Sequence, residues 1–117
     1  MARYEIFHNP RCTKSRETLA RLTDAGVTPT IVEYLKDPPT AARLREILKL
    51  LGFDDPRALM RTKEPVYAEL GLGEVDDPTK LVAAMAAHPV LIERPIVVKD
   101  GKRAVVGRPP ENVDRLL

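Results

Sequence analysis

The first 35 residues constrain the fold more than any other part of the chain, because they predict a strand, a helix and a second strand in close succession. Tyr4–Phe7 and Thr30–Leu35 are rich in β-branched and aromatic residues, which favour strands. Between them, apolar residues recur at helical spacing over residues 13–25, and Gly26 ends the run. Such a β-α-β unit favours two parallel strands.

The middle of the chain changes to a helical pattern over residues 40–88. Thr40 caps a predicted helix that Gly52 ends, because a hydroxyl residue precedes the apolar periodicity and a glycine follows it. Three more helical segments follow, at Arg57–Arg61, Val66–Leu70 and Thr79–Ala87. We interpret this region as a helical insert.

The last quarter of the chain predicts a hairpin and a helix. Pro95–Lys99 and Arg103–Gly107 read as strands, and the Asp-Gly pair at 100–101 between them is a strong hairpin signal. Pro109 or Pro110 then begins a last helix that runs to Leu117. The predicted fold class is α/β, with a mixed sheet of about four strands built as β-α-β and then β-β-α, and with the helical insert between the halves.

Composition narrows the class of protein further. A chain of 117 residues with 44% hydrophobic residues is expected to form a single domain over residues 1–117. The net charge of +2 is too small to indicate a nucleic-acid partner, and the longest apolar run, Leu81–Ala87, is far shorter than the roughly 20 residues that cross a membrane. A single cysteine excludes intramolecular disulfides and multi-cysteine metal sites, so we expect no metal and a cytoplasmic protein.

That cysteine, Cys12, falls at the predicted N-terminus of the first helix. A helix N-terminus carries partial positive charge, so a thiol placed there ionises more readily than a free cysteine. Basic residues surround it in the sequence, with His8 just before the turn and Arg11, Lys14 and Arg16 around it. Because the thiolate is the nucleophile, we expect a reactive cysteine; the alternative is a small buried apolar residue.

The motif that begins at Cys12 is C-x-x-S, since Ser15 occupies the position of a second cysteine. A serine cannot close a disulfide, so a covalent intermediate on Cys12 must be resolved by an outside thiol. We expect Ser15 to assist the cysteine. The alternative is that its hydroxyl only bonds the first turn of the helix.

Several longer segments carry a family resemblance. His8–Arg16, Glu93–Val98 and Val106–Glu111 resemble the glutaredoxin-coupled arsenate reductases, a branch of the thioredoxin-like superfamily. Shorter matches follow in the expected order, at Tyr34-Leu35 with Pro38-Pro39, at Ala58–Arg61 and at His88-Pro89. The resemblance spans nearly the whole chain.

The resemblance implies a thioredoxin-like fold and the reduction of arsenate to arsenite. Cys12 would attack arsenate and form a covalent adduct, and glutathione with glutaredoxin, or with thioredoxin in its place, would complete the two-electron reduction. No bound cofactor is implied, and glutathione is a co-substrate. The arginines that bind the oxyanion would be Arg61, Arg94 and Arg108, which suits the forked donors and permanent charge of a guanidinium.

The resemblance also implies roles for neighbours of the cysteine. Pro95 resembles the cis-proline that thioredoxin-like proteins place opposite the active cysteine; the alternative is an ordinary trans proline at a strand's first residue. His8 would assist the thiolate, and the alternative is a polar residue that closes a strand. The active-site turn would comprise Arg11, Thr13, Lys14 and Arg16.

At Thr13-Lys14 the chain departs from the better-known arsenate reductases, which carry Gly-Thr there, and resembles a sister branch. Two alternative functions therefore stay open. One is a glutathione-dependent thiol-disulfide oxidoreductase whose arginines hold glutathione carboxylates. The other is a redox-responsive regulator that binds RNA polymerase, although Ser15 lacks the second thiol of the C-x-x-C switch common in such regulators.

Overall fold

The computed structural model describes residues 2–117 and divides into two compact units. The first unit contains the chain as far as Asp37 and again Arg94–Leu117, and the second is Pro38–Glu93, which includes the predicted helical insert. Among residues 2–117, no helix is long and apolar enough to cross a membrane.

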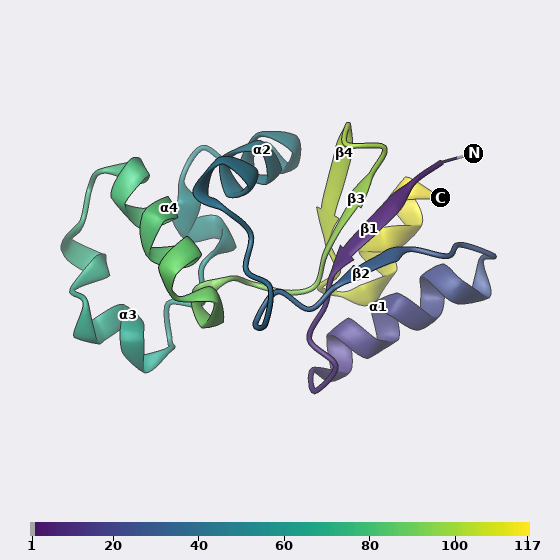
Figure 1. Cartoon of the computed structure of the whole chain (residues 1–117), viewed down its shortest axis with the longest axis horizontal. Helices are drawn as coiled ribbons and strands as arrows, with labels where there is room; N and C mark the ends of the chain where they lie inside the picture. Colours follow the sequence, from purple (N-terminus) through teal and green to yellow (C-terminus); the bar gives the residue numbers. More distant parts are fainter. Residues whose placement is uncertain (1) are drawn as a thin grey trace. The chain divides into compact units, whose positions relative to one another are not determined.

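The first unit is built on a four-stranded mixed sheet, as predicted (Figure 1). Strand β1 (Tyr4–Phe7) pairs in parallel with β2 (Thr30–Val32) and antiparallel with β3 (Ile96–Lys99), and β3 pairs antiparallel with β4 (Arg103–Val106). Helix α1 (Thr13–Asp24) connects the two parallel strands. The order is β2-β1-β3-β4, so the strand that leads to Cys12 is central.

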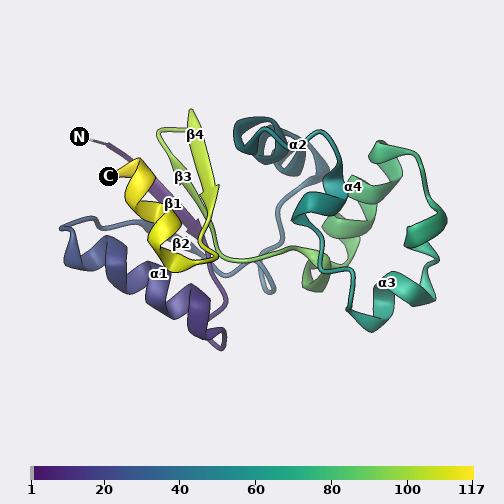
Figure 2. The same ribbon diagram turned by 180° about the vertical axis from the view of Figure 1, so that it is seen from behind.

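One face of this sheet is covered by α1 and by the C-terminal 3-10 helix η4 (Pro110–Leu116), which lie side by side in both views (Figures 1 and 2). Their apolar residues meet the inward side chains of the two central strands. The core that results is fully or almost fully buried and contains Ile6, Leu22, Val97, Val113 and Leu116. Burial of these side chains holds α1, and with it Cys12, against the sheet.

The β3–β4 hairpin follows the sequence prediction. Asp100 and Gly101 both have positive φ, 57° and 65°, and the N–H of Lys102 donates to the carbonyl of Lys99 at 3.0 Å. Two successive residues in the left-handed region are what a type I′ turn requires, which explains the Asp-Gly pair.

The second unit is helical, with α2 (Ala41–Leu51) beside α4 (Pro78–Ala87) and a short α3 (Pro65–Glu69) (Figure 1). Thr40 caps α2, since its side chain accepts the N–H of Arg43 at 3.1 Å, and Gly52 ends it at φ 74°, as predicted. Three 3-10 helices complete the unit, η1 (Pro56–Leu59), η2 (Leu72–Glu74) and η3 (Pro89–Leu91).

Some sequence predictions were wrong in extent or type. Strand β2 ends at Val32 rather than Leu35, because Glu33 begins a turn whose carbonyl accepts the N–H groups of Lys36 and Asp37. The segment predicted as helix at 57–61 is the 3-10 helix η1, which ends where Met60 pairs with Ile92 in an isolated bridge. The last helix is also 3-10 and stops at Leu116.

Candidate active site

Strand register brings three loops to one end of the sheet in the first unit. Phe7 pairs with Ile96, and Ile96 pairs with Val106, so β1 ends, β3 begins and β4 ends in the same row. The residues just beyond that row are His8–Cys12, Arg94-Pro95 and Gly107-Arg108. The register therefore brings the backbones of Arg94 and Arg108 to the end of the sheet where the cysteine turn begins.

Cys12 is the N-cap of α1, with extended backbone at φ −94° and ψ 122°. Its own N–H donates to the carbonyl of Asn9 at 3.0 Å, and its carbonyl accepts the N–H of Arg16. The N–H groups of the first helical turn lack acceptors within the helix, and the helix dipole adds positive charge there. Cys12 is 9% exposed and is therefore buried at the start of α1.

Arg16 holds the turn around the cysteine. Its Nη1 donates to the carbonyl of Pro10 at 2.9 Å and its Nη2 to the hydroxyl of Thr13 at 3.3 Å. Lys14 extends along the exposed side of α1, where its Nζ lies 3.9 Å from a Glu17 carboxylate oxygen. The N–H of Arg11 donates to the Asn9 side chain at 3.0 Å, a contact typical of Asn at a turn. Of the four residues predicted for the active-site turn, Arg11 therefore precedes α1, and Thr13, Lys14 and Arg16 lie in the first helical turn of α1.

His8 and Ser15 form a buried pair, at 6% and 0% exposure. The hydroxyl oxygen of Ser15 lies 2.5 Å from Nδ1 of His8 and accepts the N–H of Asn9 at 3.0 Å. The direction of the bond between the two side chains depends on the ring tautomer: with the ring proton on Nε2, Nδ1 accepts from the Ser15 hydroxyl. Ser15 therefore links α1 to the end of β1, which goes beyond a bond within its own helical turn.

The environment of His8 favours the neutral ring. Burial lowers the pKa of His8 below its ordinary value of 6.5, and the positive charge of Arg16 lowers it further, against the opposing effect of Glu33. A neutral imidazole suits the hydrogen bond from Ser15, because it leaves Nδ1 free to accept.

Arg108 is the arginine that meets the cysteine. Its Nη1 lies 3.9 Å from Cys12 Sγ and 3.5 Å from the carbonyl oxygen of Arg94. The guanidinium of Arg94 carries buried Nε and Nη1 atoms. The Arg94–Pro95 peptide bond is cis, as the resemblance predicts, and the Arg108–Pro109 bond is also cis, which the sequence reading missed.

Gly107 was not singled out from the sequence, yet it permits the closest packing in the site. A Cβ on Gly107 would lie 2.5 Å from Oγ1 of Thr18 and 2.8 Å from Cγ of Pro95. The N–H of Gly107 donates to the carbonyl of Pro95 at 2.8 Å, and its carbonyl accepts from the Thr18 hydroxyl at 3.3 Å. A glycine directly before a predicted anion-binding arginine is the signal that points to such a close approach.

Arg61, the third predicted oxyanion ligand, belongs to the second unit. Its N–H donates to the carbonyl of Leu91 at 2.7 Å, beside the bridge between Met60 and Ile92. Its side chain binds two carboxylates, with Nε 3.0 Å from Glu64 and Nη1 3.3 Å from Glu93. These acidic partners were not anticipated, and the oxyanion role of Arg61 stays a prediction.

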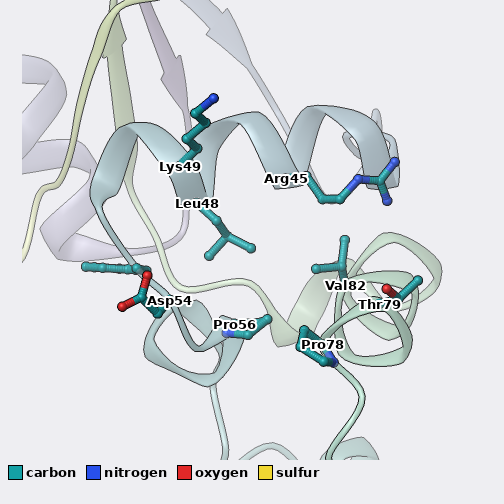
Figure 3. Close-up of a pocket in the computed structure, with 9 residues that line it drawn as sticks. Arg45, Leu48, Lys49, Asp54, Pro56, Pro78, Thr79 and Val82 are labelled. Atoms are coloured by element: carbon teal, nitrogen blue, oxygen red, sulfur yellow. The ribbon is translucent and has the colours of Figure 1, made fainter.

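Each of the two units contains a cavity. One, of about 310 Å³, is in the first unit and is lined by His8, Asn9, Pro10, Arg11, Glu33, Leu35 and Lys36. The other, of about 330 Å³, lies between α2 and α4 in the second unit (Figure 3). Leu48 and Val82 point into it and Lys49 points away (Figure 3). Within residues 2–117, no group of three or more His, Cys, Asp or Glu side chains is arranged to hold a metal ion.

Comparison with known proteins agrees with this architecture. The chain is 53% identical over 110 residues to the uncharacterized protein YfgD of Escherichia coli, with 93% of this chain and 92% of the relative covered. It is 46% identical over 118 residues to the arsenate reductase of Neisseria meningitidis, with both chains covered completely. A solved arsenate reductase structure from Vibrio cholerae is 49% identical, covers 97% of each chain and superposes with a TM-score of 0.93.

A family profile matches residues 7–116, which include the cysteine turn, the cis-proline and Arg108. The match covers almost the entire chain, as do the alignments to the relatives. The chain belongs to the ArsC family.

Proposed function

We propose that this protein is an arsenate reductase in which Cys12 is the nucleophile and glutathione with glutaredoxin is the reductant. The observation that carries the proposal is the position of Cys12 Sγ at the N-cap of α1, 3.9 Å from the guanidinium of Arg108. Helix N–H groups and a guanidinium attract a tetrahedral oxyanion to the position next to the sulfur. The names of the relatives from Neisseria and Vibrio support arsenate as that oxyanion.

In the first step the sulfur of Cys12 attacks arsenic. A sulfur–arsenic bond forms, an arsenic–oxygen bond breaks, and the oxygen leaves as water. Arg108, with Arg94 as a second cation, stabilises the charge on the remaining oxygens. Arsenic is still pentavalent at this stage, so no electrons have been transferred.

The reduction needs an outside thiol, because Ser15 offers no second sulfur and its hydroxyl is held by His8. The glutathione sulfur bonds to the Cys12 sulfur, the sulfur–arsenic bond breaks, and its electron pair stays on arsenic, which leaves as arsenite. The two sulfurs have together lost two electrons and form a mixed disulfide. A glutaredoxin thiol then attacks the glutathione sulfur and releases Cys12 as a thiol.

The test is arsenate-dependent oxidation of NADPH in the presence of glutathione, glutathione reductase and glutaredoxin. We expect turnover by the wild-type protein and none by Cys12→Ser, since a hydroxyl is a far weaker nucleophile than a thiol at neutral pH. Replacing the glutathione components by a thioredoxin system identifies the reductant, and turnover with that system alone would overturn the glutathione part of the proposal.

A deglutathionylation assay on a small mixed disulfide completes the design. Activity there, without arsenate turnover in either system, would replace arsenate reduction by general glutathione-dependent thiol exchange at Cys12. Arsenate turnover that survives in Cys12→Ser would overturn the proposed nucleophile.

A further inference from the structure

We infer that the cavity between the cysteine turn and the segment after β2 is the docking site for the charged backbone of glutathione. The inference rests on the proposed function, because it names where the outside thiol binds. The cavity has a volume of about 310 Å³, at the lower end of the range for small-molecule sites. It suits a short peptide and is too small for a folded donor protein.

The cavity and Cys12 share one stretch of backbone. His8, Asn9, Pro10 and Arg11 line the cavity, and the next residue is Cys12. The chain folds back here, since the N–H of Cys12 donates to the carbonyl of Asn9 at 3.0 Å. A molecule seated in the cavity is therefore adjacent to the turn that presents the sulfur.

The charges around the cavity match the two ends of glutathione, which carries two carboxylates and one ammonium group. Arg11 and Lys36 provide cations for carboxylates, and Glu33 provides an anion for the ammonium group. Lys36 and Glu33 are 3.9 Å apart, with side chains 81% and 44% exposed. An exposed pair at that distance is weak, so both side chains are available to a ligand.

The buried lining group is His8, which is 6% exposed. Its Nδ1 is engaged by Ser15, and within residues 2–117 no hydrogen bond involves its Nε2. With the ring proton on Nε2, His8 offers the cavity a donor for a carboxylate oxygen. Leu35, 45% exposed, adds an apolar surface for the peptide's methylene groups.

The direct test is an NMR titration of the wild-type protein with S-methylglutathione, which keeps all charges of glutathione and cannot form a disulfide. We expect saturable shifts centred on residues 8–11 and 33–36. Lys36→Glu should weaken binding by about tenfold or more, because it replaces an attractive ionic contact by a repulsive one. Lys102→Glu, an equal charge reversal on the β3–β4 turn, is the matched control and should bind as the wild type does.

A second arm separates this cavity from the oxyanion site. Arg108→Ala should leave S-methylglutathione binding unchanged, and inorganic phosphate should not displace it. Shifts that centre on Arg108 instead, displacement by phosphate, or equal binding by Lys36→Glu and the wild type would overturn the inference.

The titration also keeps the two proposals apart. Binding that depends on Lys36, in a protein that does not turn over arsenate, would refute the proposed function and leave the docking site standing. Arsenate turnover without saturable binding of S-methylglutathione would refute the docking site and leave the proposed function standing.

Discussion

Each of the two units presents a guanidinium, and the two groups have different contacts. In the first unit it belongs to Arg108, at the end of the sheet that leads to Cys12, and in the second unit it belongs to Arg61. Arg108 lies 3.9 Å from the sulfur of Cys12 and 3.5 Å from a backbone carbonyl. Arg61 binds the carboxylates of Glu64 and Glu93 at 3.0 and 3.3 Å. An oxyanion that binds Arg61 has to compete with these two carboxylates, because both already engage the guanidinium.

The largest effect is expected for Arg108→Ala. Loss of the guanidinium beside the sulfur removes a donor aimed at the developing charge, which costs about a hundredfold in kcat/KM for arsenate. Steady-state kinetics measures the change, and Arg103→Ala, an exposed arginine at the opposite end of β4, is the matched control. An unchanged kcat/KM in Arg108→Ala would contradict the role given to the Arg108 guanidinium beside the sulfur.

The second largest effect is expected for Gly107→Ala. The new methyl group would lie 2.5 Å from Thr18 and 2.8 Å from Pro95, so the end of β4 must shift and carry Arg108 with it. We expect a loss of about 1–3 kcal/mol in the free energy of unfolding, measured with urea, and a lower kcat/KM. Gly73→Ala is the control, because a Cβ there meets its nearest atom at an ordinary 3.8 Å. Equal stability of the two variants would contradict the close-approach argument.

Arg61→Ala should change arsenate kinetics less than Arg108→Ala does, by about tenfold or less in KM. The expectation follows from the carboxylates that already engage the guanidinium of Arg61. Arg45→Ala, an exposed arginine on α2, serves as the control in the same assay. A loss as large as that of Arg108→Ala would instead support the oxyanion role predicted from the sequence resemblance.

The smallest effect is expected in how the free energy of unfolding changes with pH, through His8. Because burial lowers the pKa of His8 below 6.5, the unfolded chain binds a proton more tightly than the folded one. The resulting stability is fully present above pH 6.5 and is lost as the pH falls through the lower folded pKa. Urea unfolding at a series of pH values should show that the free energy of unfolding depends less steeply on pH in His8→Asn than in the wild type. The amide oxygen of the new Asn can replace Nδ1 as an acceptor. An identical dependence of the free energy of unfolding on pH in the wild type and His8→Asn would contradict a contribution from the lowered pKa of His8.

Much of the fold is readable from local patterns. The strand–turn–helix that carries Cys12, the cap at Thr40, the stop at Gly52 and the Asp-Gly hairpin all depend on residues close together in the chain, and all were predicted. The errors fall where local signals compete: the β-branched and aromatic residues from Thr30 onward favour a strand as far as Leu35, but the turn begun by Glu33 ends the strand earlier. The structure divides into two compact units, and the assignment of residues 1–117 to a single domain stays a prediction.

The sequence by itself determined that one thiol stands at a helix N-terminus and that no internal partner thiol exists. It did not determine which arginine meets that thiol, since Cys12 and Arg108 are 96 residues apart and meet only through the β1–β3–β4 register. The same holds for the Gly107–Thr18 contact and for the carboxylates that engage Arg61. Such contacts join distant parts of the chain, and the physical reason is that strand pairing and core packing, rather than local conformational preference, set the distances between them.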